Sequence, residues 1–195
     1  MEESISLLSQ IKETFACKET DIRTYSPITL AFLGDCIYDL VIRTVLVERC
    51  NRDANSLHKI KSAVVKADAQ AEMIEALLPE LPEGEAGVYR RGRNAKTSHT
   101  AKNASVVAYR KATGFEALMG YLYLTEQTDR LLFLVKKGLT LIGKEIWRQD
   151  QVTGKTGRNE EKMRYEEFTI EGRNAVIEAL RSGKPMDKIL IQDGL

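Results

Sequence analysis

Two apolar segments, residues 30–39 and 115–124, have hydrophobic residues at helical spacing, and each carries an acidic side chain close to a glycine. In the first segment Asp35 follows Gly34, and in the second a glycine lies one helical turn after Glu116. A carboxylate is costly to bury in an apolar run unless a partner or a cation compensates its charge. If the two helices pack together, their carboxylates converge, which is how proteins hold a hard divalent cation. The pattern therefore predicts a helical core with a candidate metal site between these helices.

Helical periodicity continues through most of the chain, up to about residue 149. Ser26 and Pro27 are typical of a helix start, because serine caps a helix and proline fits its first turn. The sequence predicts an all-α domain of about five to seven helices over residues 1–149, with a loop at 92–103 and a kink near Thr113 and Gly114. The predicted helices span residues 27–50, 56–78, 83–91, 104–111, 115–125 and 129–149.

Positive charge is concentrated in one window of the sequence. Between Ala86 and Phe115 there is no Asp or Glu, but there are seven Lys or Arg residues. Because the chain holds 29 basic and 28 acidic residues, this leaves 22 basic against 28 acidic residues elsewhere. A basic patch on an acidic body favours a polyanionic partner, although a solvated helix face explains the same pattern.

The remaining composition fits a globular protein of the cytoplasm. A length of 195 residues supports one well-packed domain, and apolar and charged contents of 43% and 29% are ordinary. Three cysteines without metal-ligand spacing are typical of reduced thiols, and Cys36 is predicted to lie in the core. The acidic N-terminus is unlike a signal peptide, and no apolar run approaches the roughly 20 residues of a spanning helix. No membrane association is expected.

A change of composition divides the chain after residue 149. Residues 150–158 are polar with two glycines, and residues 150–166 are predicted to form a linker. Within residues 167–195 a strand, a helix and a second strand are predicted, which is the start of a β-α-β unit. Two strands and one helix bury too little surface for independent stability, so no activity is assigned to this truncated tail.

Asp35, Asp39 and Glu116 form the candidate metal site. Asp39 lies one turn beyond Asp35 on the same helix face. Two or three carboxylates from crossing helices suit Mg²⁺, with Mn²⁺ as the alternative, because both ions prefer oxygen ligands. A purely structural explanation also exists, in which the acids pair with Arg43, Arg110 or backbone amides.

These segments also carry a family resemblance. Residues 30–39, Leu-Ala-Phe-Leu-Gly-Asp-Cys-Ile-Tyr-Asp, resemble the signature helix of the ribonuclease III catalytic domain, and residues 115–124 resemble its second catalytic segment. Residues 89–96, Tyr-Arg-Arg-Gly-Arg-Asn-Ala-Lys, and the length of the helical part are similar to the Mini-III branch, which lacks the double-stranded-RNA-binding domain. The resemblance covers roughly residues 20–148.

The resemblance implies a Mg²⁺-dependent endoribonuclease that cleaves double-stranded RNA in the maturation of large-subunit (23S) ribosomal RNA precursor. Asp35 and Glu116 would then be the catalytic metal ligands, and Asp39 a supporting carboxylate. Proteins contact duplex RNA through its phosphates and 2′-hydroxyl groups, which basic and neutral polar side chains recognise. The side chains of the basic window expected to bind RNA are Arg90, Arg91, Arg93, Asn94, Lys96 and Lys102.

The resemblance further implies a homodimer, in which two sites face the two strands of an RNA duplex. Phe32, Tyr121 and Tyr123 suit that interface, although burial in the core is the commoner role of such side chains. An assisting ribosomal protein is a further candidate partner.

Two departures from the family pattern keep other functions open. Full-length ribonuclease III enzymes have acids where this chain has Ala31 and Thr113, and the Mini-III branch is similarly reduced. If those losses inactivate the site, the chain is a non-catalytic RNA-binding protein of the same fold. A third hypothesis is an all-α nucleotide pyrophosphatase, which would not need the basic window.

The tail has a resemblance of its own. Residues 171–180, Glu-Gly-Arg-Asn-Ala-Val-Ile-Glu-Ala-Leu, through Asp193 and Gly194, resemble the start of the substrate-binding domain of SpoU-type RNA ribose methyltransferases. Only that beginning is present, without a methyl-donor-binding domain. The tail is therefore not expected to make this chain a methyltransferase.

Overall fold

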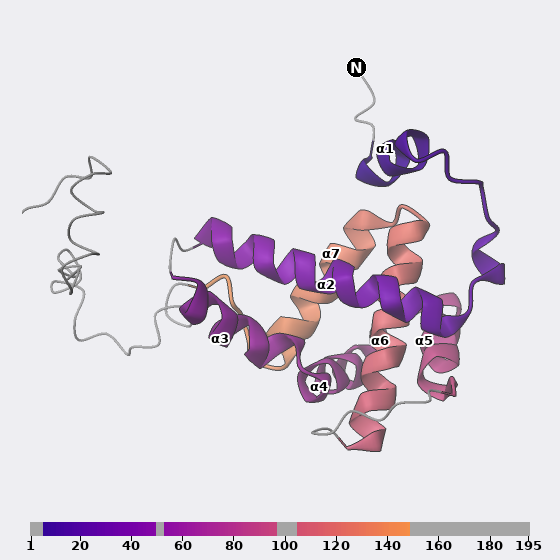
Figure 1. Ribbon diagram of the computed structural model, residues 1–195. Helices are drawn as coiled ribbons and strands as arrows, with labels where there is room; N and C mark the ends of the chain where they lie inside the picture. Colours follow the sequence, from indigo (N-terminus) through magenta and orange to yellow (C-terminus); the bar gives the residue numbers. More distant parts are fainter. Residues whose placement is uncertain (1–5, 50–52, 97–104, 149–195) are drawn as a thin grey trace, which may run out of the picture. The chain divides into compact units, whose positions relative to one another are not determined.

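The structure is a computed structural model that describes residues 6–49, 53–96 and 105–148. Within these ranges every regular element is a helix, which confirms the predicted all-α domain. No helix of the described residues is long and apolar enough to cross a membrane. Figure 1 shows the α-helices in chain order: α1 (Leu7–Thr14), α2 (Pro27–Arg49), α3 (Ala54–Val65), α4 (Ala67–Leu77), α5 (Glu83–Asn94), α6 (Val106–Leu124) and α7 (Thr128–Leu141). Two short 3-10 helices, Ile22–Thr24 and Leu78–Glu80, precede α2 and α5.

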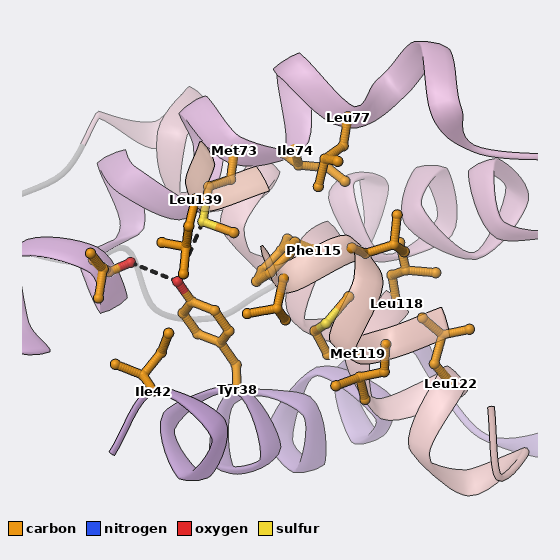
Figure 2. Packing of buried hydrophobic residues seen from close by; sticks show 14 of the residues in the cluster. Tyr38, Ile42, Met73, Ile74, Leu77, Phe115, Leu118, Met119, Leu122 and Leu139 are labelled. Atoms are coloured by element: carbon orange, nitrogen blue, oxygen red, sulfur yellow. Dashed lines mark hydrogen bonds between the residues drawn. The ribbon is translucent and has the colours of Figure 1, made fainter. Parts of the chain in front are cut away.

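Helix α6 is the centre of the fold, and α2, α4, α5 and α7 all pack against it (Figure 1). Its sequence is apolar on nearly every side, as expected of a helix that protein surrounds. The rings of Tyr38 on α2 and Phe115 on α6 pack edge to face, with centroids 5.1 Å apart. Figure 2 shows the buried side chains around this pair, among them Ile42, Met73, Ile74, Leu77, Leu118, Met119, Leu122 and Leu139.

The main chains of α2 and α6 touch at two glycines. A Cβ added at Gly34 would lie 1.8 Å from the carbonyl oxygen of Glu116, and one at Gly120 would lie 2.1 Å from the carbonyl oxygen of Leu30. Both distances are far below any real Cβ contact, so neither position has room for a side chain. The two apolar segments therefore pack against each other, as the sequence predicts.

The single helix predicted for residues 56–78 is wrong, because two helices, α3 and α4, occupy this part of the chain. The chain leaves helical geometry at Lys66, whose ψ of 151° is extended. Neither glycine nor proline marks this break, so the sequence contains no local signal for it. The buried Tyr38 hydroxyl donates a hydrogen bond of 3.0 Å to the Val64 carbonyl, which lacks a helical partner at the end of α3. Tertiary packing stabilises the break.

Helix α6 is continuous, so the kink predicted near Thr113 and Gly114 is wrong. Gly114 is instead a contact position, because a Cβ there would lie 2.6 Å from the ring of Tyr89 on α5. The cap of α6 is Ser105, whose side-chain oxygen accepts a hydrogen bond of 3.1 Å from the Ala108 N–H. The glycine therefore serves the close approach of α5 and does not bend α6.

Two helix ends also differ from the prediction. Helix α5 extends to Asn94, so the start of the loop predicted for residues 92–103 is helical. Helix α7 ends at Leu141, short of the predicted 149, and Gly143 follows in the left-handed region with a φ of 66°.

The outer face of α2 is less buried than expected. Phe32 is 83% exposed, and Cys36 is also exposed, so a core position is wrong for both. The buried face of this helix instead follows Leu30, Gly34 and Tyr38, which point toward α6. Tyr121 and Tyr123 are partly buried against the hydrophobic core.

Several sequence predictions fall outside the described residues. These are the linker at 150–166, the β-α-β tail at 167–195 and Lys102.

Candidate functional site

The glycine contact between α2 and α6 brings Asp35 and Glu116 together. Asp35 follows Gly34 on α2, and the carbonyl oxygen of Glu116 is the atom nearest to the place of a Gly34 Cβ. The side chains interact as well, because the negative charge of Asp35 raises the pKa of Glu116. Two acids that are 81 residues apart in the sequence therefore lie within electrostatic reach of each other.

The Glu116 carboxyl has an unusual ionisation. Burial is the largest cause that raises its pKa, followed by repulsion from Asp35, and together they raise it to about 8 from an ordinary value of 4.5. Hydrogen bonding from Gln70 on α4 acts in the opposite direction but does not compensate. Near neutral pH this carboxyl is mostly protonated until a positive charge approaches it.

Asp35 stands at the exposed side of the pair. Its pKa is also raised, first by partial desolvation and then by the negative charge of Asp39, while Lys61 on α3 lowers it. Because Asp35 reaches solvent, a hydrated ion or a substrate has access to the site from outside.

Asp39 is held by two cations. Its Oδ2 lies 2.5 Å from Nε of Arg43, one turn along α2, and its Oδ1 lies 2.7 Å from Nζ of Lys61. Burial raises the pKa of Asp39, but the hydrogen bonds from Lys61 and Arg43 outweigh it, so the pKa is lowered. Asp39 therefore stays ionised within an ion-pair network beside Asp35.

Asp35 and Glu116 form a donor set that fits a hard divalent cation. A cation between two carboxylates with raised pKa values replaces their repulsion with attraction. Mg²⁺ often binds through only one or two carboxylates and keeps several waters. In the part of the chain that the structure describes, no group of three or more His, Cys, Asp and Glu side chains is arranged for a metal ion.

The two positions that lack the family's acids add no ligand. Ala31 is buried against the core, and the Thr113 hydroxyl donates a hydrogen bond of 3.0 Å to the Tyr109 carbonyl of its own helix. A metal at this point would therefore depend on Asp35 and Glu116.

Of the side chains predicted to bind RNA, those that the structure describes lie in the second half of α5 and just beyond it. Arg91, Asn94 and Lys96 are exposed, whereas Arg90 forms an ion pair with Glu83 of the same helix. The guanidinium of Arg93 lies over the Tyr89 ring, 5.7 Å from its centroid.

A basic hollow lies between the end of α5 and the start of α6. Its volume is about 310 Å³, and three of its five lining residues are cationic. The lining residues are Arg93, Asn94, Val107, Arg110 and Lys111. Lys111 also pairs with Glu75 on α4, so part of its charge is compensated.

Two residues at the site were missed in the sequence, Lys61 and Gln70. Each is a polar residue about one helical turn from an apolar residue of its helix: Lys61 lies four residues after Leu57, and Gln70 lies three residues before Met73. A polar residue on a core-facing stripe is the signal that would have indicated both.

Comparisons with known proteins identify the family of this fold. Residues 28–127 match the ribonuclease III domain model, and residues 169–195 match the model of the RNA 2′-O ribose methyltransferase substrate-binding segment. The chain is 42% identical to the Mini-ribonuclease 3 of a Thermoanaerobacter species, over 70% of this chain and 96% of that protein. It is 44% identical to the Mini-ribonuclease 3 of Brevibacillus brevis, over 60% of this chain and 87% of that protein.

A solved structure shows the same fold. The crystal structure of a Fusobacterium nucleatum protein aligns with a TM-score of 0.57 and 29% identity, over 63% of this chain and 94% of that chain. Since the domain model covers half of the sequence and the Mini-ribonuclease 3 relatives are covered nearly completely, the chain belongs to the ribonuclease III family, in its Mini-ribonuclease 3 branch.

Proposed function

We propose that this endoribonuclease cleaves double-stranded RNA with a divalent cation, Mg²⁺ or Mn²⁺, held by Asp35 and Glu116. The observation that carries the proposal is the convergence of these two acids at the glycine contact of α2 and α6, where burial raises the pKa of both carboxyls and the charge of Asp35 raises that of Glu116 further. An arrangement that disfavours two negative charges is stabilised by a cation.

Each side chain has a separate task in the proposed reaction. Glu116 and Asp35 bind the cation from two helices, and Asp39, fixed by Arg43 and Lys61, maintains the negative field around Asp35. When bound, a divalent cation supplies an activated water and neutralises charge on the phosphodiester. Lys61 pairs with Asp39, and its charge also lowers the pKa of Asp35, so it weakens the repulsion between the three acids and the RNA backbone.

The basic end of α5 supports a nucleic-acid substrate. Arg91, Arg93, Asn94 and Lys96 present positive charge and hydrogen-bond donors, which contact phosphates without reading base sequence. The hollow that Arg93 shares with Arg110 and Lys111 adds a second set of cations beside them. We therefore propose that this surface positions the duplex while the carboxylates would hold the cation that assists cleavage.

The exposed face of α2 supports a homodimer. Phe32 is 83% exposed and Leu40 is 52% exposed, and both lie on the helix that carries Asp35. Large apolar side chains exposed on one helix face are typical of a surface that a partner covers. A second copy of the chain at this face would place two sites near each other, as cleavage of two strands requires.

The proposed biological substrate is the precursor of large-subunit (23S) ribosomal RNA, in the cytoplasm. The similarity to Mini-ribonuclease 3 proteins supports this proposal. Accumulation of an unprocessed 23S precursor in cells that lack the protein would support it, and normal processing in those cells would contradict it.

The decisive experiment compares cleavage of a long RNA duplex by the wild type and by Asp35→Asn, with and without Mg²⁺. The variant keeps the size of the side chain but removes the charge that a cation needs. We expect the wild type to cut only with Mg²⁺ and Asp35→Asn to lose at least about 100-fold in rate while still binding the duplex. Asp129→Asn, at an exposed acid in the first turn of α7, is the matched control and should cut normally.

The same assay separates the alternatives. A wild type that binds the duplex but never cuts it would be a non-catalytic RNA-binding protein. Hydrolysis of free nucleoside triphosphates that survives charge reversal of Arg90, Arg91 and Arg93 would indicate a nucleotide pyrophosphatase. Retained duplex cleavage by Asp35→Asn would refute the assigned site.

A further inference from the structure

Gln70 on α4 is a buried polar side chain without a hydrogen-bond partner among the described residues. The residue is 1% exposed, and neither its Nε2 nor its Oε1 forms a hydrogen bond of normal geometry. The other buried residues of this helix are apolar: Ala69, Ala71, Met73, Ile74 and Leu77.

Burying an unpaired amide at this position lowers the stability of the fold. An unpaired amide in the interior loses its hydrogen bonds to water without replacement, whereas a leucine or methionine of similar size would only gain from burial. Nearly all buried polar groups in proteins have a partner, so an exception calls for an explanation. The polar groups that surround the Gln70 amide are therefore the ones to consider.

The polar group that faces Gln70 is the carboxyl of Glu116. Helix α4 packs directly on α6, and the nearby Gln70 side chain lowers the pKa of Glu116. The only hydrogen-bond donor on a glutamine side chain is its amide nitrogen, so Nε2 is the atom that can favour the charged form of the carboxyl. The side chain is close enough to affect the carboxyl, but no hydrogen bond of normal geometry joins the two.

We infer that Gln70 is a positioning residue, whose Nε2–H donates to one oxygen of the Glu116 carboxylate and turns the other oxygen toward Asp35. This inference rests on the proposed function, because it gives a task to Gln70 only if Glu116 binds a cation. A carboxylate held by one donor is pre-oriented for the ion and loses less rotational freedom on binding. Gln70 itself touches neither the ion nor the RNA.

Three substitutions separate positioning from other roles. Gln70→Leu keeps the volume and removes the donor. Gln70→Glu keeps the shape but offers an acceptor, and a carboxylate so close to Asp35 and Glu116 would be a strong metal ligand if residue 70 reached the ion. Ile74→Val, one turn along α4 in the same core, loosens the helix without changing a polar group.

The measurement is Mn²⁺ binding to the whole chain without RNA, by isothermal titration calorimetry, with thermal unfolding of the metal-free proteins recorded in parallel. We expect Gln70→Leu to unfold at the wild-type temperature or above it, because the unpaired amide is gone, but to bind Mn²⁺ about 10–100-fold more weakly. Gln70→Glu should also bind more weakly, because an ionised carboxylate cannot donate. Ile74→Val should unfold at a lower temperature and bind Mn²⁺ as the wild type does.

Cleavage kinetics give a second readout. The Mg²⁺ concentration for half-maximal cleavage should rise in Gln70→Leu by the same factor as the Mn²⁺ dissociation constant, while the KM for the duplex stays unchanged. If Gln70→Leu does not fold, Gln70→Met takes its place with the same expectations.

Two results would overturn the role of Gln70 and leave the proposed function intact. One is Mn²⁺ binding by Gln70→Leu that equals the wild type, while Asp35→Asn and Glu116→Gln lose it. The other is tighter binding by Gln70→Glu, which would make residue 70 a direct ligand. Wild-type protein that binds no Mn²⁺, or Mn²⁺ binding that survives Asp35→Asn and Glu116→Gln, would overturn both proposals.

Discussion

The raised pKa of Glu116 makes the stability of the fold depend on pH. Below about pH 4.5 this carboxyl is protonated in the folded and the unfolded chain, and above about pH 8 it is ionised in both. Between these values the folded chain holds a proton that the unfolded chain has released. Stability therefore falls as the pH rises through this window, as long as no cation is bound.

At the residue scale we predict that Glu116→Gln removes this pH dependence. An amide carries no charge to desolvate, so above about pH 8 the variant should be more stable than the metal-free wild type, by on the order of 3 kcal/mol. The measurement is urea unfolding at pH 5 and pH 8 without divalent cations. Glu48→Gln, at an exposed acid of α2, is the matched control and should follow the wild type. A wild-type slope that persists in Glu116→Gln would contradict the prediction.

At the scale of helices, the contact between α2 and α6 has no tolerance for a side chain. The main chains touch at Gly34 and Gly120, where an added Cβ would overlap a carbonyl oxygen of the facing helix. Backbone atoms cannot rotate out of the way as a flexible side chain does, so the helices would have to separate. Such a separation would also pull Asp35 away from Glu116.

We predict that Gly120→Ala lowers the free energy of unfolding by at least about 3 kcal/mol and abolishes cleavage. Alanine normally favours a helix, so the loss would come from the overlap with the Leu30 carbonyl, 2.1 Å away. Gly84→Ala in α5 is the matched control, because nothing lies within 4 Å of a Cβ there, and it should stabilise by about 0.5–1 kcal/mol. Thermal unfolding followed by circular dichroism measures both, and a Gly120→Ala protein as stable as the wild type would contradict the packing described here.

Hydrophobic spacing in the sequence predicts the helical class and the packing of the two acid-bearing segments, and the Ser26–Pro27 pair predicts the start of α2. It does not predict the break at Lys66, because the stabilising hydrogen bond comes from Tyr38, which is distant in sequence. The kink predicted at Gly114 is wrong for a similar reason. A glycine that bends a helix and a glycine that makes room for a neighbouring ring look the same in the sequence.

The residues of the candidate site also fall into two groups, those that the sequence indicates and those that only the packing of the helices reveals. Asp35 and Glu116 are recognisable as acids in apolar runs, whereas Gln70 and Lys61 join them only through the packing of α3 and α4. Such contacts depend on how helices cross, which local spacing does not specify.

At the scale of the whole molecule, the exposed face of α2 is the proposed contact between two copies of the chain. We predict that Phe32→Glu converts a homodimer into a monomer, because a charged side chain in an apolar interface loses its hydration without a partner. Light scattering coupled to size-exclusion chromatography measures the mass in solution. Phe15→Glu is the matched control, because Phe15 is 74% exposed outside this face, and it should remain dimeric. A wild type that is already monomeric, or a Phe32→Glu protein that stays dimeric, would contradict the proposed interface.

The glycine contact between α2 and α6 also has a consequence during synthesis of the protein. Asp35 leaves the ribosome long before Glu116, and the two acids meet only when both helices are available to touch. A nascent chain that has produced α2 alone therefore holds half of the proposed site and cannot cut RNA. Because the close fit of the helices brings the two acids together, the proposed site is complete only after the core has closed.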